Sequence, residues 1–176
     1  MSDTKRRERF EQTVLPHLDA AYNLARFLTR NDQDAQDVTQ EACLRAFRFF
    51  DGYQGGNMQA WLLTIVRHTC YAWLHQNRRA DSTGEFNEEI HSSEVSGSAD
   101  PEIQVLASVD KETLNRALED LPDVFREALV LREMEGMSYK EIADVTSASL
   151  GTVMSRLARA RTRLRQSLSV ELRRGY

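Results

Sequence analysis

The polar side chains best suited to recognising a ligand gather in the last predicted helix. At about 100° per residue, hydroxyl and guanidinium groups between residues 152 and 163 share one face of that helix. Hydroxyls suit the edges of DNA bases, and guanidinium groups suit both bases and phosphates. Residues 156–174 hold seven arginines against the single acid Glu171. The pattern predicts contacts with duplex DNA by Ser149, Thr152, Ser155, Arg156, Arg159 and Arg163.

A second helix must position this one in a DNA groove. Ser138 and Glu141 have the spacing of a capping box, which starts a short helix that reaches about residue 145. Ala143, ten residues before Val153, is small enough to let the two helices cross closely. An amphipathic surface helix would show the same arginines, but the capped partner helix favours a helix-turn-helix. The apolar stripe expected at the contact is Val153, Leu157, Ala160, Leu164 and Leu168.

A second group of residues suits single-stranded DNA. Such a strand is held by aromatic stacking and backbone charge, and an extruded base is read in a polar pocket. The loop 51–58 can line such a pocket, and basic residues of the next helix can follow the strand. The candidates are Tyr53, Gln54, Asn57, Arg67, His75, Arg78 and Arg79. The other aromatics here (Phe47, Phe50, Trp61 and Trp73) are expected in the core, whereas Tyr53 in the loop is expected to stand apart.

A third group forms an acidic face. Asp34, Asp37 and Glu41 follow one another at helical spacing, opposite an apolar stripe. Such a face is usually only solvated, so these residues alone do not indicate a binding site.

Helical periodicity accounts for most of the remaining sequence. Apolar residues trace one face over 9–30, where Pro16 predicts a kink or a break. Asn31 and Asp32 can cap a helix that reaches about residue 50, with an inner stripe of Ala35, Val38, Ala42, Ala46 and Phe49. A helix over 58–79 is expected to bury Trp61, Ile65, Thr69, Ala72 and Trp73. Leu121-Pro122 and Gly136 mark later boundaries, and the last helix is expected from about 151 to near 172.

Charge and composition divide the 176 residues into three parts. The net charge of −4 separates into +2 over 1–80, −8 over 81–110 and +2 over 111–176. Residues 80–100 lack periodicity, which predicts a flexible, self-repelling linker, and Asp100-Pro101 is expected to restart a helix. We predict an all-α fold with an N-terminal domain over 1–80, an acidic linker over 81–105 and a C-terminal helix-turn-helix domain over 106–176.

Several classes of protein are disfavoured. No phosphate-binding loop, dinucleotide fingerprint or catalytic motif is present, so we expect no enzyme, no cofactor and no small-molecule substrate. His68 and Cys70 are close, but a zinc site needs about four ligands, so no metal is expected. No membrane insertion or secretory signal is indicated. Cys43 and Cys70 are therefore expected to be reduced, inertly packed thiols in the cytoplasm.

Two segments resemble the extracytoplasmic-function sigma factors of bacterial RNA polymerase. LPDVFREALVLREMEGMSYKEIADVTSASLGTVMSRLARARTRLR, from Leu121 to Arg165, is similar to the family's fourth region. DAQDVTQE, from Asp34 to Glu41, resembles its second region. Four positions depart from the family pattern. Ser147 stands where a turn glycine is usual, which predicts a differently shaped turn, His68 and His75 replace Asn and Arg, and Ala72 replaces an acid.

The resemblance implies a role for each group of residues. The acidic face would dock on core RNA polymerase through Asp37, Gln40, Glu41 and Arg45. The loop and following helix would capture and melt the minus-ten element, and the helix-turn-helix would read the minus-thirty-five element. The implied partners are core RNA polymerase, promoter DNA and an anti-sigma factor, which in this family often holds its partner at the inner membrane.

Two other functions fit parts of the pattern. A dimeric helix-turn-helix regulator would bind a palindromic duplex tightly without polymerase. A protein–protein adaptor that uses only the acidic face would tolerate Arg156→Ala.

Overall fold

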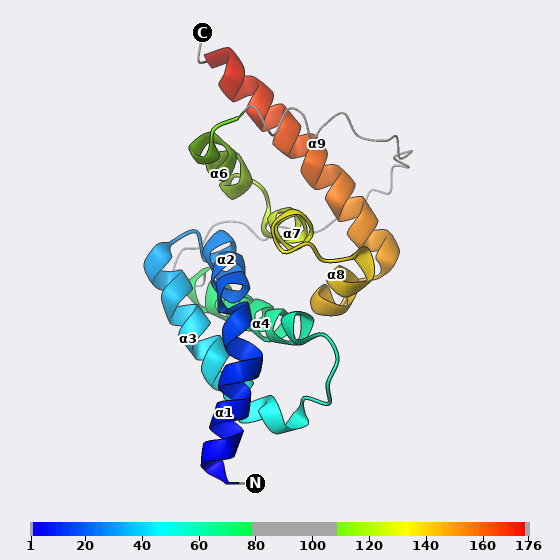
Figure 1. The fold of residues 1–176 in the computed structure, drawn as a ribbon. Helices are drawn as coiled ribbons and strands as arrows, with labels where there is room; N and C mark the ends of the chain where they lie inside the picture. The colour runs from blue at the N-terminus through cyan, green and yellow to red at the C-terminus, as the bar shows by residue number, and fades with distance from the viewer. Residues whose placement is uncertain (1, 79–108, 175–176) are drawn as a thin grey trace.

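The computed structural model describes residues 2–78 and 109–174, and both ranges are built of helices without a strand (Figure 1). We call the first range the N-terminal module and the second the C-terminal module. The all-α architecture with two helical modules confirms the predicted fold class. Three predicted features lie outside the described residues, namely the linker over 81–105, the helix start at Asp100 and the strand-binding residue Arg79.

The N-terminal module begins with two helices separated by a short turn. Pro16 lies in that turn and produces the predicted break, because proline cannot continue the hydrogen-bond pattern of the first helix. Asn31 caps α3, and its side chain accepts a hydrogen bond from the backbone N–H of Asp34 at 3.0 Å. The elements are α1 (Asp3–Val14), η1 (Leu15–His17), α2 (Leu18–Thr29), α3 (Asp32–Phe49), η2 (Phe50–Gly52) and α4 (Met58–Arg78).

The core of this module forms where α2, α3 and α4 pack together. Four of the five residues predicted for the inner stripe of α3 are buried, namely Ala35, Val38, Ala42 and Ala46. The prediction for Phe49 is wrong, because its exposed fraction is 63%. The α-helix ends at that residue, and the 3-10 turn that follows inserts Phe50 into the core instead. The ring of Phe10 meets Phe50 edge-on, with 5.3 Å between centroids.

The buried face of α4 also differs from the predicted one. Thr69 is buried as expected, but Trp61, Ile65 and Trp73 are half-buried and Ala72 is exposed. The residues with no exposed surface are Leu62, Leu63, Val66 and Cys70. α4 contacts α2 and α3 and also α8 of the other module. A helix covered by two groups of neighbours does not show the single stripe of a surface helix.

The first helix of the C-terminal module begins after Asp110, whose side chain caps it. Leu121-Pro122 separates the first two helices, as predicted, and Gly136 turns the chain with a φ of 64°. Ser138 and Glu141 form the predicted capping box. The elements are α6 (Lys111–Glu119), α7 (Asp123–Leu129), the π-helical turn η3 (Val130–Met134), α8 (Tyr139–Thr146) and α9 (Leu150–Arg174).

The apolar stripe of α9 is buried as predicted. Each of its five residues is at most 6% exposed, namely Val153, Leu157, Ala160, Leu164 and Leu168. The helix packs against α6, α7 and α8. Ala143 is half-buried against the same core. The pair α8 and α9 therefore has the helix-turn-helix arrangement that the sequence predicts.

The turn between α8 and α9 has a left-handed residue. Ser147 has φ 52° and ψ 37°, and its N–H bonds the carbonyl of Ala143. The prediction of a differently shaped turn is therefore wrong, because serine adopts the conformation that glycine would adopt. A left-handed conformation costs a residue with a Cβ roughly 1–2 kcal/mol.

Ser147→Gly is expected to stabilise the protein by about 0.5–1 kcal/mol, because glycine adopts this conformation without a steric penalty. Urea unfolding followed by circular dichroism measures the change. Ser169→Gly, at an exposed position inside α9, is the matched control and should destabilise by about 0.5 kcal/mol. A loss of stability in the Ser147 variant would contradict the expectation.

The two modules pack on each other, with α7 against α2 and α8 against α4 (Figure 1). Arg126 of α7 has no exposed surface and bridges them, because its guanidinium donates to the carbonyl of Phe27 in α2 at 2.9 Å. It also donates to carbonyls of its own module, those of Leu118 at 2.9 Å, Glu119 at 3.2 Å and Leu121. Burial and the nearby charge of Arg30 lower the pKa of Arg126 from its usual value.

Candidate nucleic-acid and polymerase interfaces

Three of the six predicted duplex-binding residues at α9 are exposed, and the other three are half-buried. Ser149 and Ser155 are exposed and Thr152 is half-buried. The hydroxyl of Ser149 accepts from the backbone N–H of Thr152 at 3.1 Å, so Ser149 also caps this helix. Of the arginines, Arg156 and Arg159 are half-buried, while Arg163 is exposed and lies over the ring of Phe125, 5.0 Å from its centroid.

Two apolar side chains on the same end of α9 escaped the sequence analysis. Leu150 is 51% exposed and Met154 is 55% exposed, one helical turn apart. They flank the exposed serines, where apolar atoms can contact the methyl groups of thymine. For Met154 the available signal was its position outside the helical spacing of the buried stripe. Leu150 shares that spacing, but it is the first residue of α9 and stays exposed, so the spacing gave no signal for it.

The loop before α4 is held by its own contacts. Tyr53 is half-buried, with its ring stacked on Phe50 at 6.3 Å and close to Trp61 at 5.4 Å. Its hydroxyl donates to the carbonyl of Gly56 at 2.6 Å. The expectation that Tyr53 stands apart from the core is therefore wrong, because the loop folds back and places this ring on the aromatic cluster.

Asn57 and Gln54 are both exposed in this loop. Asn57 has two partners, because its carbonyl oxygen accepts from the N–H of Ala60 at 3.1 Å and its amide donates to Glu141 of α8. One predicted strand-binding residue thus already contacts the C-terminal module.

Arg67 on α4 contacts the C-terminal module as well. Its guanidinium donates to the carboxylate of Glu127 on α7, and its charge lies over the ring of Tyr71, 4.7 Å from the centroid. The hydroxyl of Tyr71 donates to the other oxygen of Glu127 at 3.1 Å. Burial raises the pKa of Glu127, and the charge and hydrogen bond of Arg67 oppose that shift. Tyr71 is itself largely removed from water, and this burial, together with the charge of Glu127, raises the pKa of its hydroxyl.

The remaining strand-binding candidates lie toward the end of α4. His75 is exposed, and Arg78 is the last residue of the helix. Of the strand-binding candidates, Asn57 just before α4 and Arg67 on α4 contact the C-terminal module.

The predicted acidic face is present on α3. Asp37, Gln40 and Glu41 are exposed, and Arg45 pairs with Glu41 at 3.0 Å. In the middle of this face lies Leu44, which is 59% exposed and which the sequence analysis did not single out. Its spacing of three residues from Glu41 and seven from Asp37 was the available signal. Leu44 adds apolar surface to an otherwise charged face.

The histidines and cysteines do not assemble a metal site within residues 2–78 and 109–174. Cys70 is fully buried, Cys43 is half-buried and His68 is exposed. Within the same ranges, no helix combines the length and apolar character needed to cross a bilayer.

Burial is expected to make the two thiols react at very different rates. Burial and the charge of Glu127 raise the pKa of Cys70 from 9.0 to about 12, and burial also raises the pKa of Cys43. A thiol reagent at pH 8 should modify Cys43 slowly in the native protein, and it should modify Cys70 only after the protein unfolds. Mass spectrometry of peptides after timed labelling measures both rates. Comparable labelling of both thiols in the folded protein would contradict this expectation.

Each of the two modules matches a known protein family. The family models of sigma-70 region 2 and sigma-70 region 4 match residues 13–80 and 111–164. An extracytoplasmic-function (ECF) sigma factor of Mycolicibacterium smegmatis, SigE, is 36% identical over 91% of this chain, which spans 62% of that relative's length. The ECF sigma-E factor of Escherichia coli K12 is 34% identical over 80% of this chain and 77% of its own length.

A solved structure of a sigma factor is also similar to this chain. The sigma factor RpoE in complex with the anti-sigma factor NepR, from Bartonella quintana, matches with a TM-score of 0.73 and 31% identity. The match covers 93% of this chain and 98% of that chain. A two-module helical protein with these regions is a bacterial transcription initiation factor. The chain belongs to the ECF sigma factors of the sigma-70 family.

Proposed function

We propose that this chain docks on core RNA polymerase through the exposed face of α3 and directs it to a promoter with both modules. The loop before α4 and α4 itself capture the opened minus-ten strand. The N-terminal end of α9 reads the minus-thirty-five duplex. The assigned core-binding residues are Asp37, Gln40, Glu41 and Arg45, together with Leu44.

The occurrence of region 2 and region 4 on one chain carries this proposal. Promoter opening needs no covalent chemistry from the chain, because binding the unpaired strand can offset the few kcal/mol of unstacking per step. The proposal therefore includes no enzymatic activity.

The test is transcription in vitro with purified core RNA polymerase and a template library that contains candidate promoters. Addition of the chain should produce promoter-specific transcripts that core enzyme alone does not make. The double variant Ser155→Ala, Arg159→Ala should reduce specific transcription at least about tenfold, because it removes a base-edge and a phosphate contact. Core binding should be unchanged in that variant. Failure to direct any specific transcript would refute the proposal.

We also propose an anti-sigma factor as a regulatory partner. The Bartonella relative was solved in complex with one, and CnrH, which is 27% identical with a TM-score of 0.66, was solved with the cytosolic domain of CnrY. The chain would act in the cytoplasm, where core polymerase is, and an anchored anti-sigma factor could hold it at the inner membrane. The proposed acidic linker over 81–105 would pass between the modules inside the polymerase.

A dimeric helix-turn-helix regulator is not favoured, because the N-terminal module matches region 2 of sigma-70 factors. Such a regulator would bind duplex DNA tightly without polymerase. Binding of a promoter fragment with and without core enzyme distinguishes the two functions.

A further inference from the structure

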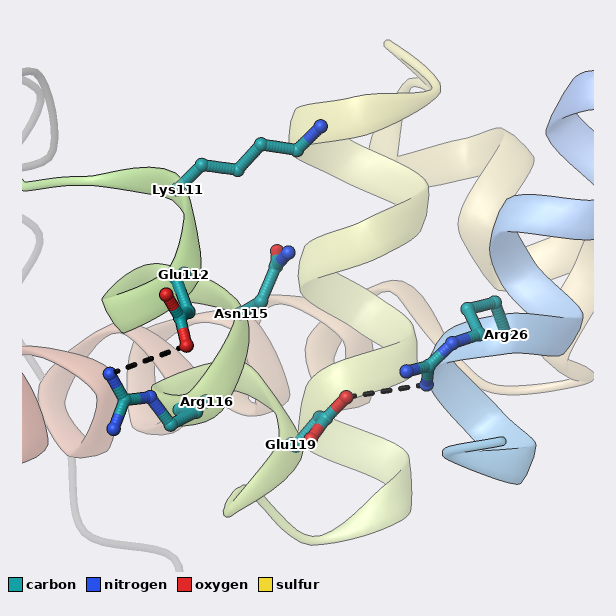
Figure 2. Close-up of a pocket in the computed structure, with 6 residues that line it drawn as sticks. All are labelled: Arg26, Lys111, Glu112, Asn115, Arg116 and Glu119. Atoms are coloured by element: carbon teal, nitrogen blue, oxygen red, sulfur yellow. Dashed lines mark ion pairs between the residues drawn. The ribbon is translucent and has the colours of Figure 1, made fainter. Parts of the chain in front are cut away.

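The side-chain pairs between the modules share one polarity. The N-terminal module contributes cations, amides and the hydroxyl of Tyr71, and the C-terminal module contributes carboxylates. Arg126 of the C-terminal module also crosses the interface, where it bonds the neutral carbonyl of Phe27. Arg26 of α2 pairs with Glu119 at the end of α6 at 3.2 Å, beside an open groove whose lining Figure 2 shows. Arg30 pairs with Asp123 at 3.8 Å. This polarity is the one a nucleic acid would present to the N-terminal module, because its phosphates also supply negative charge.

Carboxylates of the C-terminal module occupy the side of α4 assigned to the strand. Glu127, with only 1% of its side chain exposed, holds Arg67 and accepts from Tyr71. Glu141 accepts from Asn57, and Glu135 accepts from Gln59 at 3.4 Å and from Asn23 at 3.5 Å. Arg67 and Asn57 are two of the proposed strand-binding residues, so a DNA strand and these carboxylates compete for the same donors.

The other two proposed surfaces stay open in this arrangement. On α3, Asp37, Glu41 and Leu44 are exposed. On α9, Ser149 and Ser155 are exposed. The contact between the modules therefore occupies the polar groups of Arg67 and Asn57, whereas Gln54 and His75 stay exposed. It leaves the polymerase-binding and duplex-binding surfaces accessible.

We propose that the C-terminal module inhibits the N-terminal module in cis, with Glu127, Glu135 and Glu141 standing in for DNA phosphates on α4. This inference rests on the proposed function of α4. The chain can dock on polymerase while closed, but it binds an unpaired strand only after the modules separate. The apparent affinity for single-stranded DNA is then reduced by the small fraction of open molecules.

The test compares full-length variants that weaken this interface with a control of equal charge. Glu127→Gln combined with Glu135→Ala removes two interface carboxylates. Glu133→Gln combined with Asp144→Asn removes two carboxylates elsewhere in the C-terminal module, since Glu133 pairs with Arg161 of the same module and Asp144 is exposed. Tyr71→Phe removes one interface hydrogen bond from the N-terminal side and serves if the first variant does not fold.

Two measurements are made on each variant. Fluorescence anisotropy with a labelled single-stranded DNA of random sequence gives Kd, because stacking and phosphate contacts tolerate sequence. Small-angle X-ray scattering without DNA gives the radius of gyration. The interface variant should show a larger radius and bind DNA about tenfold or more tightly than wild type. Tyr71→Phe should change both quantities in the same direction by less, and the control variant should change neither.

Three results would overturn the proposal. The folded interface variant could open without binding DNA more tightly, or it could neither open nor bind more tightly. The control variant could gain as much affinity as the interface variant, which would assign the effect to net charge. None of these results bears on whether the wild-type chain directs transcription with core polymerase, so failure of the proposed function is measured separately.

Discussion

Arg126→Leu is expected to lower the free energy of unfolding by about 3–5 kcal/mol, the range for removing one partner of a buried ion pair. The guanidinium has no exposed surface and pairs with Asp123 at 3.0 Å. It also bonds carbonyls that leucine would leave without a donor, those of Phe27, Leu118, Glu119 and Leu121. Because small domains are stable by only about 5–15 kcal/mol, this loss removes a large part of the stability of the protein.

Urea unfolding by circular dichroism measures this loss, with Arg132→Leu as the control. Arg132 is half-buried, donates to the carbonyl of Met137 at 2.8 Å and lies over the ring of Tyr139, so its loss should cost about 1 kcal/mol. Arg126→Lys should also destabilise strongly, because an ammonium group cannot reach several carbonyls in the fixed geometry of a guanidinium. Equal stability of the Arg126→Leu variant and wild type would show that these carbonyls find other partners.

Leu44→Asp is expected to weaken binding to core RNA polymerase about 30-fold or more, the effect of losing a hot-spot residue worth at least about 2 kcal/mol. Leu44 is 59% exposed in the middle of the proposed docking face of α3. An aspartate there would bury an unpaired charge in the complex and would add to the acids already on that face. Because Leu44 contributes little to the module core, the free protein should keep its stability.

A competition assay against a labelled sigma factor on core polymerase measures this change. Val170→Asp is the matched control, since Val170 is 48% exposed on α9, away from the docking face. The control should leave core binding within about twofold of wild type, the range for surface changes outside an interface. Unchanged core binding by the Leu44 variant would place the polymerase contact on another face.

Local features of the chain were predictable because they depend on neighbouring residues. Pro16 breaks the first helix, Asn31 caps α3 and the capping box starts α8 at Ser138. The stripe of α9 was predictable for a similar reason, because that helix packs on one side and its periodicity reports that side directly. The exposed acidic face of α3 followed from the same spacing rule.

The surroundings of the predicted binding residues depended on contacts between distant segments. α4 is covered by two groups of neighbours, so its periodicity indicated a face rotated away from the buried one. Phe49 was misplaced because the helix ends there and the next turn buries Phe50. Tyr53 was misplaced because the loop folds its ring back onto Phe50 and Trp61.

The amino-acid sequence was sufficient to define two helical modules, the caps and breaks of their helices and the residue types available for DNA and polymerase. Only the tertiary structure decided which of those residues already contact the other module of the same chain. Arg67 and Glu127 lie sixty positions apart, and no local periodicity records a pairing across that separation. Helix formation is governed by interactions within a few residues, whereas the partner of a side chain is set by how whole helices pack.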